Sequence, residues 1–475
     1  MNKNKKLCMI GFAVTGGVLF TAFQNFTDVT NPGAKACSVA KVNELLEPAT
    51  DTKWIVKLNC STKLPAAQQI TKQIIYEGKA ASGATLDCAG STIYKAGADA
   101  LVIRSKVVMK DNVKTWERPE NVTVKNCNIQ GGVRIYGMAK NGEGLDLRES
   151  SRQDANHSKR AKDNAPKNIM LHKIKIASEG RIALYISPGV TFVTLQNSSI
   201  SGNSPLAVYL DAESANNSFL NNSINTVTEK RELFAIDGSA NNIIQGNKFS
   251  SLSNGGIYVY RNCGEGGTIR HQTPSGNKIQ DNIFYYNKYK GGNPSILLGS
   301  RNGNRKYCDL DNGFPWGSSV NDGDYARNNI VTGNKIYVRS VNDMIVSNHS
   351  SNQVNTNYTV TAATVNSVGA PPVVTKPIVT SPGNSCQAIS KSCGYDMGLY
   401  RDGQRGGVKG YLKRDNKCNY SVRVTASKNG ADSGFINAKS VQVVGDRGYR
   451  YTAKIANNEF VVTSSAGQEV CQINL

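Results

Sequence analysis

The chain has 475 residues, enough for two or three domains. Hydrophobic residues make up 39% and aromatic residues 7%, with 45 glycines and 14 prolines, a composition that suits a polar, turn-rich β protein. The formal net charge of +21 favours a polyanionic partner, although a solvated basic surface without a specific partner is the alternative. The basic residues are scattered and no nucleic-acid-binding motif is present, so we expect no nucleic-acid partner.

Residues 1–36 are expected to be a signal peptide or an N-terminal anchor. Lys3, Lys5 and Lys6 precede an apolar stretch from Leu7 to Phe23, the charge order of an export signal. The stretch is short for a membrane span, and we expect no transmembrane domain beyond this candidate anchor. The chain is therefore expected to be secreted, periplasmic or displayed on the cell surface.

The cysteines predict disulfides. Without Cys8, ten remain, an even number in a chain that carries an export signal. Metal binding by thiolates is the rival interpretation, weakened by the absence of any CxxC pair. Proximity in the sequence predicts the bridges Cys37–Cys60, Cys88–Cys127 and Cys263–Cys308, and two bridges among Cys386, Cys393, Cys418 and Cys471.

Residues 37–75 are expected to form an N-terminal cap with a short helical turn in Lys41–Pro48, because the first coil of a solenoid needs a cover. Residues 76–358 then hold seven blocks in which apolar residues alternate with polar ones beside Asn or Gly. The last apolar residues of the second to fifth blocks are separated by 24, 24 and 25 residues. Alternation predicts strands, and a fixed period predicts a solenoid. The blocks are Asn121–Ile129, Asn168–Ile176, Phe192–Ile200, Asn216–Ile224, Asn241–Phe249, Gly276–Phe284 and Asn328–Ile336.

A second apolar run follows most of the blocks. Two or three short strands per coil, with no helix, predict an all-β fold, a parallel β-helix over residues 76–358. The recurring Asn is expected at left-handed turn positions, and stacked Asn side chains are expected to form ladders. The runs are Val133–Tyr136, Ile182–Ile186, Leu206–Leu210, Leu233–Ile236, Ile257–Tyr260 and Ser295–Leu298.

The asparagine-rich N-x-I/V-x-x-N-x-I pattern resembles the right-handed parallel β-helix proteins of the pectate lyase type over roughly residues 75–350. The resemblance implies the scaffold, which hosts lyases, glycoside hydrolases, epimerases and phage tailspikes. The sequence has no pectate-lyase RxPxxR, no polygalacturonase NTD…DD…GHG…RxK set and no DPHD of alginate epimerases. No catalytic residue of these families can therefore be carried over.

Two polar insertions, Ala139–Lys167 and Gly299–Arg327, interrupt the repeat, and insertions in solenoids often gather on the binding face. Residues 359–385 are rich in Thr, Val, Pro and Ser and predict a linker. Residues 386–475, with four cysteines and alternating strands such as Tyr420–Ala426 and Phe460–Ser464, predict a small disulfide-stapled β-sandwich. This unit either binds carbohydrate or a surface, or stabilises the chain without a ligand.

The second strand of each coil is expected to carry the site. If its apolar residues point inward, its outward residues form two columns that suit a groove for an acidic sugar polymer, since tyrosine rings stack on pyranoses and arginines hold carboxylates. One column holds Tyr185, Tyr209, Ala235 and Tyr258, the other holds Ser187, Asp211, Asp237 and Tyr260, and Arg134 and Arg261 lie on the same face.

Asp211 and Asp237 matter most in this arrangement. On successive coils their carboxylates would lie about 5 Å apart, near the separation in retaining glycosidases. Like-charge repulsion would raise one pKa and make a general acid, or the pair could bind calcium. In a lyase, calcium or Arg261 would neutralise a uronate, and Tyr260 or His271 would remove its C5 proton. The alternative is two solvated acids at strand ends, balanced by Arg261.

The loop Arg261–Ser275 is the densest polar stretch and is expected to lie rigidly beside the acids through the Cys263–Cys308 bridge. A second candidate calcium site is Asp309 with Asp311, whose spacing lacks the EF-hand pattern. The residues expected to bind substrate are Arg134, Tyr185, Tyr209, Tyr258, Glu265, Arg270, Arg301 and Arg305.

The sequence therefore predicts an exported β-helix that acts on an anionic polysaccharide as a lyase or a glycoside hydrolase, with calcium as the only candidate cofactor. The alternative is a non-catalytic β-helix that binds carbohydrate or a cell surface. A phage tailspike is disfavoured by the signal segment, and a structural solenoid without a ligand is the remaining option. The sequence leaves the oligomeric state open.

Overall fold

The computed structural model describes residues 34–286, 293–299, 311–321, 324–337 and 344–359, together with residues 389–399, 405–414, 420–426, 431–436, 440–444, 450–456, 459–464 and 469–474. The predicted signal segment and most of the predicted linker lie outside these ranges. So do Arg301, Arg305, Cys308, Asp309, Cys386 and Cys418. No helix of the described residues is long and apolar enough to span a membrane.

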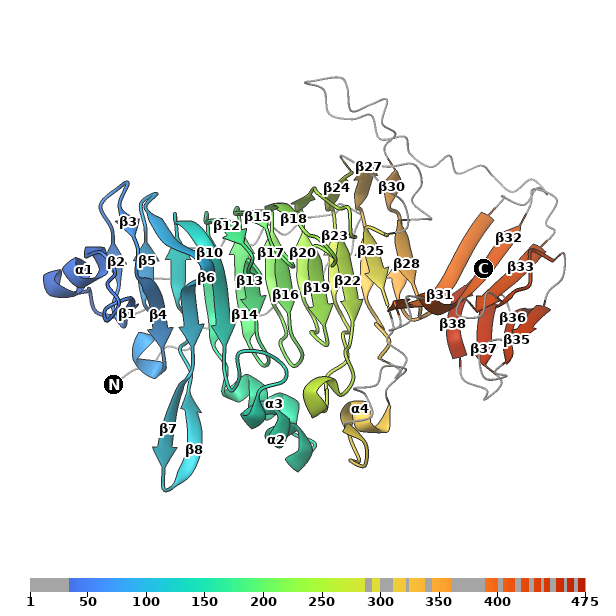
Figure 1. Cartoon of the computed structure of the whole chain (residues 1–475), viewed down its shortest axis with the longest axis horizontal. Helices are drawn as coiled ribbons and strands as arrows, with labels where there is room; N and C mark the ends of the chain where they lie inside the picture. The colour runs from blue at the N-terminus through green and yellow to red at the C-terminus, as the bar shows by residue number, and fades with distance from the viewer. Residues whose placement is uncertain are drawn as a thin grey trace, which may run out of the picture. The chain divides into compact units, whose positions relative to one another are not determined.

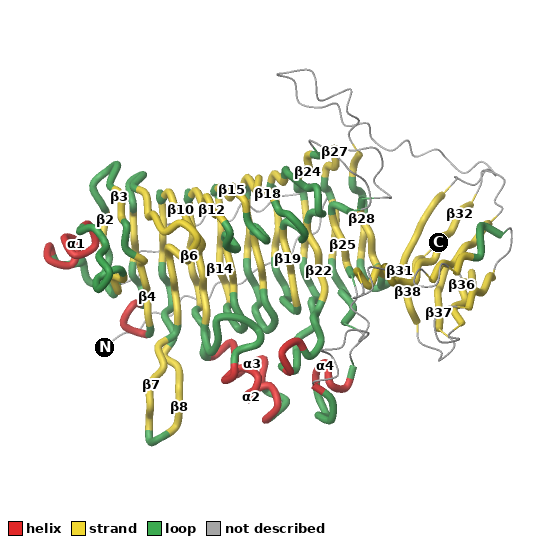
Figure 2. The backbone as a smooth tube through the Cα atoms, in the orientation of Figure 1, coloured by secondary structure: helices red, strands yellow, loops and turns green. Residues whose placement is uncertain are grey.

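The chain winds into the parallel β-helix that the repeat predicts, with three short strands in each regular coil (Figure 1, Figure 2). Strands at the same position in successive coils pair in parallel, which gives three long sheets. Sheet A contains β3 (Gln69–Ile70), β12 (Lys175–Glu179), β15 (Ser199–Asn203), β18 (Ser223–Val227), β21 (Lys248–Phe249), β24 (Ile283–Tyr285), β27 (Lys335–Tyr337) and β30 (Tyr358–Thr359).

Sheet B contains the second strands of the coils, and two long strands, β6 (Thr92–Arg104) and β10 (Asn128–Tyr136), run through both sheets. Its other members are β1 (Ile55–Lys57), β4 (Gln73–Glu77), β13 (Leu184–Ile186), β16 (Val208–Leu210), β19 (Phe234–Asp237), β22 (Ile257–Tyr260), β25 (Ile296–Leu298) and β28 (Ile345–Ser347). Sheet C contains β2 (Thr62–Lys63), β5 (Thr85–Asp87), β9 (Thr123–Lys125), β11 (Lys167–His172), β14 (Thr191–Gln196), β17 (Ser218–Leu220), β20 (Ile243–Gln245), β23 (Lys278–Gln280), β26 (Ile330–Thr332) and β29 (Gln353–Val354).

The alternating apolar residues fill the interior of the coils. In sheet B, Leu184, Val208, Phe234 and Ile257 are paired from coil to coil and are all fully buried. Burial of such a continuous apolar column supplies the main stabilisation of a solenoid, because each coil covers the next.

Two asparagine ladders run along the turns, as the sequence predicts. In one of them, Asn247 Nδ2 donates to Asn282 Oδ1 (3.0 Å) and Asn247 Oδ1 accepts from the Nδ2 of Asn222 (2.9 Å). These amides are buried, so the ladder provides hydrogen-bond partners that water cannot reach. The ladder members are Asn217, Asn242, Asn277, Asn329 and Asn352 in one row, and Asn222, Asn247, Asn282, Asn334 and Asn357 in the other.

Helix α1 (Val39–Leu46) covers the first coil, where Ser38 Oγ accepts a hydrogen bond from the Lys41 backbone as an N-cap. The predicted bridges Cys37–Cys60 and Cys88–Cys127 are both formed in this part of the chain. The remaining short element here is η1 (Lys79–Ala81).

Several elements that the periodicity does not predict extend from the coils (Figure 1). The strands β7 (Lys106–Lys110) and β8 (Val113–Glu117) form a separate hairpin. The first insertion folds into α2 (Leu145–Gln153) and α3 (His157–Asp163), and η2 (Glu265–Gly267) and α4 (Gly317–Val320) follow later.

The C-terminal strands form two four-stranded antiparallel sheets that share one apolar core, which includes Val422, Ala453 and Phe460. Cys471 is buried there and is disulfide-bonded. The strands are β31 (Ile389–Leu399), β32 (Arg405–Arg414), β33 (Tyr420–Ala426) and β34 (Ala431–Asp432), then β35 (Ser440–Val444), β36 (Arg450–Ala456), β37 (Glu459–Ser464) and β38 (Glu469–Asn474).

Candidate functional site

The two predicted columns exist on the outer face of sheet B. Tyr185 is paired with Tyr209, which is paired in turn with Ala235. In the second column, Asp237 is paired with Tyr260. Arg134 is paired with Tyr185 one coil earlier, so the predicted register is correct.

The expected open groove is wrong, because the columns are covered. Asp211, Asp237 and Tyr260 are at most 2% exposed, and Tyr185 and Tyr209 are 8% and 7% exposed. Strand alternation places a side chain on the outer face of a sheet, but it does not tell whether another segment covers that face. Here residues 139–165, the Arg261–Ser275 loop and the described residues 311–321 lie over the face.

Each aspartate is bound by a tyrosine of the preceding coil. Tyr185 Oη donates to Asp211 Oδ2 and Tyr209 Oη donates to Asp237 Oδ2, both at 2.6 Å. Asp237 also accepts hydrogen bonds from the backbone and the side-chain amide of Asn262, at 2.8 and 2.6 Å. The tyrosine rings therefore orient acids, and their low exposure leaves no face for the predicted stacking on pyranose rings.

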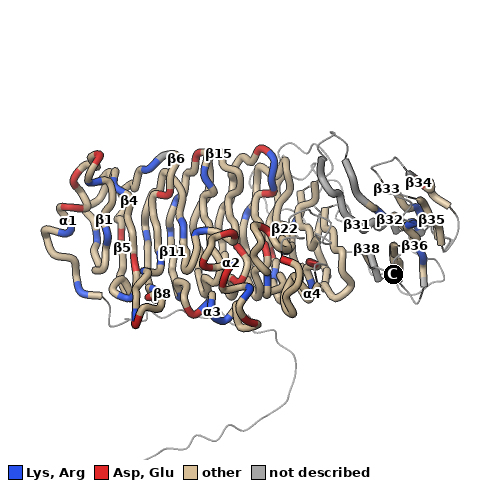
Figure 3. Tube along the Cα trace, turned by 60° about the horizontal axis from the view of Figure 1, so that its bottom comes forward, with Lys and Arg blue, Asp and Glu red and all other residues tan. Residues whose placement is uncertain are grey.

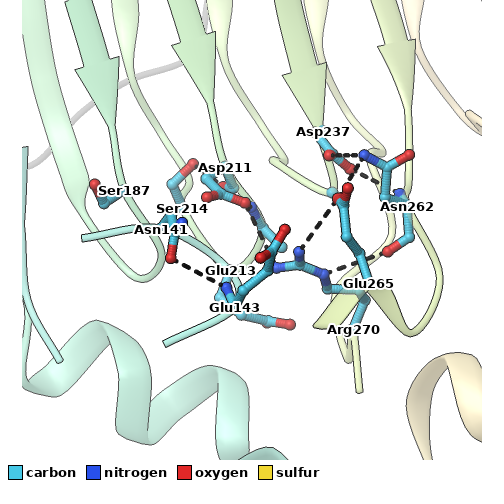
Figure 4. Close-up of polar contacts among 12 residues, drawn as sticks. Asn141, Glu143, Ser187, Asp211, Glu213, Ser214, Asp237, Asn262, Glu265 and Arg270 are labelled. Carbon is cyan, nitrogen blue, oxygen red and sulfur yellow. Dashed lines mark hydrogen bonds and ion pairs between the residues drawn. The ribbon is translucent and has the colours of Figure 1, made fainter. Parts of the chain in front are cut away.

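Arg270 is the cation that faces this acidic pair (Figure 4). Its side chain is fully buried, and its contacts are long: 3.5 Å from Nη1 to Asp211 Oδ1, 3.3 Å from Nε to the Asn262 carbonyl and 4.0 Å from Nη2 to Glu265 Oε2. A Cβ atom added to Gly142 would lie 2.2 Å from the guanidinium. The first insertion thus closes directly over Arg270, and a side chain at position 142 would displace the guanidinium.

Burial raises the pKa of the Asp211 carboxyl to about 6, against the lowering effect of the Arg270 charge, while the charge of Asp237 adds to the increase. Burial and the neighbouring Asp211 together raise the pKa of the Tyr185 hydroxyl well above its usual value. Asp211 is therefore a carboxyl group that can hold or release a proton near neutral pH.

We call the three covering segments, residues 139–165, 261–275 and 311–321, the lid. They are bound to one another through Ser151: its Oγ accepts from the Ile269 backbone (3.0 Å), and its carbonyl oxygen accepts from His271 Nε2 (2.8 Å) and Trp316 Nε1 (2.9 Å). Arg152 Nε donates to the Gly267 carbonyl at 3.0 Å. In Figures 1 and 2, α2, α3 and α4 accordingly lie along one edge of the β-helix.

Arg261 and His271 do not reach the acidic pair. The Arg261 guanidinium forms a buried ion pair with Asp324 and donates to the Asn321 carbonyl at 2.6 Å, so it anchors the second insertion. His271 contacts Ser151 of the lid. The predictions that Arg261 neutralises a uronate and that His271 acts as a base are therefore not supported by this arrangement. Cys263 is buried and disulfide-bonded, while its predicted partner lies outside the described residues.

Tyr260 lies on the predicted face but is also bound. Its hydroxyl donates to Glu232 (2.8 Å) and accepts from Arg231 (2.6 Å). Tyr258 is half-buried and lies against Gly255. Glu265, whose side chain is 29% exposed, accepts from Asn262 at 3.0 Å and lies near Arg270. Tyr260 is thus a buried hydrogen-bonding residue rather than an accessible base.

The predicted calcium sites do not match the donors that surround the acids. Asp211 and Asp237 accept hydrogen bonds from tyrosines and an amide and face Arg270, whose charge would repel a divalent cation. Asp311 is buried and bonds Ser318, and its proposed partner Asp309 lies outside the described residues. Within the described ranges, no group of three or more His, Cys, Asp or Glu residues could hold a metal ion.

Two buried residues of the lid contact were missed in the sequence. Glu213 accepts hydrogen bonds from the backbone of His271 (2.8 Å) and Gln272 (3.1 Å), which holds the loop on the coil. His157 is fully buried, its Nδ1 lies 3.0 Å from Ser150 Oγ, and burial lowers its pKa to about 4. The only sequence signal for Glu213 is its position two residues after Asp211. Nothing in the sequence indicates the role of His157.

Accessible cations lie along the edge where the chain enters sheet B. The Arg181 and Arg231 side chains are 42% and 40% exposed, and Arg134 is 12% exposed. Arg134 Nε donates to Asp99 (3.1 Å), and its guanidinium lies 4.1 Å from the centre of the Tyr185 ring. Among the described residues, the Arg181 guanidinium has one polar contact, 3.4 Å to Asp99. Arg181 and Arg231 were not predicted as site residues.

The lid surface has mixed charge. Figure 3 shows acidic and basic residues interspersed around α2 and α3 rather than segregated by sign. Pairs such as Lys114–Asp146 and Lys159–Asp163 neutralise one another there. A polyanion would therefore find no continuous basic surface on the lid. The arginines at the edge of sheet B are also paired with acids, Arg134 and Arg181 with Asp99 and Arg231 with Glu232.

No protein-family model matches the sequence, and no curated protein sequence matches it either. Similar solved structures include the alginate lyase from Paenibacillus sp. str. FPU-7, which is 13% identical, with a TM-score of 0.34 over 63% of this chain and 88% of that chain. The Dettilon tailspike protein is 12% identical (TM-score 0.21, 88% and 85% covered). Tailspike protein 2 from Escherichia coli O157:H7 bacteriophage CAB120 is 10% identical (TM-score 0.19, 87% and 64% covered). These β-helix proteins share the type of fold, and at such values they carry no argument about function.

Proposed function

We propose that the chain binds an anionic polysaccharide along the arginine edge of sheet B, with Arg181 and Arg231 as the principal contacts. Arg134 lies beside Tyr185 and shares Asp99 with Arg181. The observation that carries the proposal is the partial exposure of the Arg181 and Arg231 side chains, 42% and 40%, beside a rigid sheet. Each of them also pairs with one acid, Arg181 with Asp99 and Arg231 with Glu232. A planar guanidinium binds a carboxylate or a sulfate through two parallel hydrogen bonds. A fixed row of such groups suits a polymer with regularly spaced acidic groups.

The spacing supports a polymeric ligand. Arg181 precedes β13 and Arg231 precedes β19, which are separated by one intervening strand, β16. With about 4.8 Å between neighbouring strands, the two positions lie about 10 Å apart along the β-helix axis. This separation is comparable to the length of a disaccharide, so alternate sugars of a linear acidic chain would meet the two arginines.

The disulfides support an oxidising compartment. Bridges such as Cys37–Cys60 and Cys88–Cys127 persist in secreted and periplasmic proteins and are rare in the cytosol. An anionic polysaccharide outside the cytoplasm, in an extracellular matrix, a capsule or a cell wall, is the matching class of ligand.

The test is equilibrium binding of the purified chain to alginate, polygalacturonate, hyaluronate and chondroitin sulfate at fixed ionic strength. Arg181→Ala/Arg231→Ala should lose most of the binding, and Arg181→Lys/Arg231→Lys should keep only part of it. The charge-matched control is Lys175→Ala/Lys278→Ala, two exposed lysines of sheets A and C. Equal losses in the arginine and lysine variants would mean that only net charge matters and would reject the site.

Cleavage of the bound polymer is the second candidate function, favoured by one observation. Asp211 is a carboxyl group with a pKa of about 6 beside a tyrosine hydroxyl, an acidic partner on the next coil and a buried arginine. In hydrolysis, Asp211 would protonate the leaving oxygen, with Asp237 as the second carboxylate. The acids are buried, so this chemistry requires displacement of the lid.

Cleavage is tested on the same polymers by ultraviolet absorbance, which reports unsaturated lyase ends, and by a reducing-end assay, which reports hydrolysis. Asp237→Asn should abolish turnover and retain binding if the pair is catalytic. Retained turnover in this variant would reject Asp237 as a catalytic residue, and no product on any polymer that is bound would leave the non-catalytic function.

A further inference from the structure

Phe192 has a left-handed backbone, with a φ of +58°. Its counterparts at the start of the same strand position, Asn168, Asn216 and Asn241, have φ values between +55° and +58°. Asn tolerates this conformation because its short side chain hydrogen-bonds local backbone, whereas a bulky residue is crowded there. A phenylalanine thus occupies a strained position that the other blocks of the repeat give to asparagine or, at Gly276, to glycine.

Burial of the ring does not compensate for this strain. The Phe192 side chain is 45% exposed, and the Lys167 Nζ atom lies 5.5 Å from the centre of its ring. Side chains at this position follow the axis from coil to coil, as Asn168 shows by donating to Asn121 Oδ1 at 3.1 Å. The phenyl ring and the ammonium group are therefore presented together within a row of polar amides.

Backbone strain that the core does not require is typical of functional contacts. We propose that Phe192 and Lys167 form a binding contact for a pyranose ring that carries a carboxylate or a sulfate. The C–H face of the sugar packs on the phenyl ring, and the ammonium group pairs with the acidic substituent.

This contact rests on the proposed function, because the ligand class is the same. It lies apart from the arginine edge: Arg181 precedes β13, and Phe192 follows β13 after the turn to sheet C. The two features flank sheet B on opposite sides. The proposal therefore adds a second place at which the polymer, or a branch of it, meets the protein.

The test compares variants of Phe192 in the full chain. Phe192→Asn restores the commonest residue of the other coils, so it should raise the melting temperature by about 1–2 °C through relief of left-handed strain. The same variant should bind the acidic polymer several-fold more weakly. Phe192→Trp should retain binding, and Phe192→Leu, which keeps the strain and loses the ring, should not. Val227→Asn, at an apolar side chain with 53% exposure on β18, is the matched control and should bind normally.

The probes are alginate, polygalacturonate, hyaluronate and chondroitin sulfate. Unchanged binding by Phe192→Asn, together with loss of binding in Arg181→Ala/Arg231→Ala, would overturn this contact and leave the proposed function standing. A wild-type chain that binds none of the polymers would reject both. A lower melting temperature for Phe192→Asn would also overturn the contact, because the ring would then be a structural residue.

Discussion

The buried pair of Asp211 and Arg270 gives the sharpest prediction. Both side chains are about 98% buried, and Arg270 is the cation nearest to an acid that otherwise accepts only neutral hydrogen bonds. Arg270→Met keeps an unbranched apolar stem and removes the charge. Loss of one partner of a buried ion pair costs about 3–5 kcal/mol of unfolding free energy, because the remaining acid must either stay charged without its counter-ion or take up a proton.

The pH dependence of this loss separates electrostatics from packing. The Asp211 carboxyl has a pKa of about 6, raised by burial and lowered by Arg270, so removal of Arg270 raises the pKa further. The folded state then holds a proton that the unfolded state releases, and stability falls as the pH rises. Between pH 5 and pH 7 the wild type ionises Asp211 and the variant does not. Averaged over this range, the folded variant binds about half a proton more at Asp211 than the folded wild type. The loss of unfolding free energy in Arg270→Met is therefore about 1.4 kcal/mol larger at pH 7 than at pH 5.

Urea unfolding of the wild type, Arg270→Met, Asp211→Asn and the double variant at both pH values measures the effect. The double variant should show neither the pH dependence nor the full sum of the single losses, since the two residues interact. Equal losses for Arg270→Met at pH 5 and pH 7, or additive losses in the cycle, would refute the assignment of Arg270 as the counter-ion of Asp211.

Two further predictions concern the lid and the core. The double variant Glu143→Cys/Gly266→Cys should join two segments of the lid to each other when oxidised, because a Cβ on Gly266 would lie 2.9 Å from Glu143 Cβ, within a small shift of disulfide geometry. Polymer binding at the arginine edge should be unchanged, and any cleavage that needs these two segments to separate should stop and return on reduction. Cleavage by the oxidised form would exclude separation of the two segments as the route to the buried acids. Asn247→Ala should lower the unfolding free energy by about 2–4 kcal/mol, because the buried ladder groups that Asn247 bonds are left without partners. The control Asn225→Ala, at an exposed position, should cost less than about 0.5 kcal/mol. Equal losses for the two variants in urea unfolding would contradict a stabilising role of the ladder.

The coils could be predicted from the sequence because one period governs both the strands and the turns. Leu184, Val208 and Phe234 alternate with Tyr185 and Tyr209, which fixed the faces of sheet B before any pairing was known. The Asn residues indicated the ladders because each coil repeats the same buried amide. Each coil covers its neighbour, so local pattern and tertiary contact coincide in this part of the chain.

The burial of the site could not be predicted, because the segments that cover it have no period. Arg270 was expected to meet substrate, but it lies under Gly142, a contact between residues 128 positions apart that no local pattern reveals. Tyr185 was expected to stack on a sugar, and its hydroxyl instead bonds Asp211 on the next coil. Helices α2 and α3 arise in a polar insertion whose apolar residues Leu147 and Ala161 form a separate cluster with Met138, against which Trp116 of the β7–β8 hairpin packs, and no local pattern reveals it.

A structure of the chain bound to an acidic oligosaccharide, at least a tetrasaccharide of the polymer that binds most tightly, tests the central proposal most directly. The account predicts carboxylate or sulfate oxygens within hydrogen-bond distance of the Arg181 and Arg231 guanidinium groups, on sugars two residues apart. An oligosaccharide bound on another face, with both guanidinium groups still exposed, would contradict it.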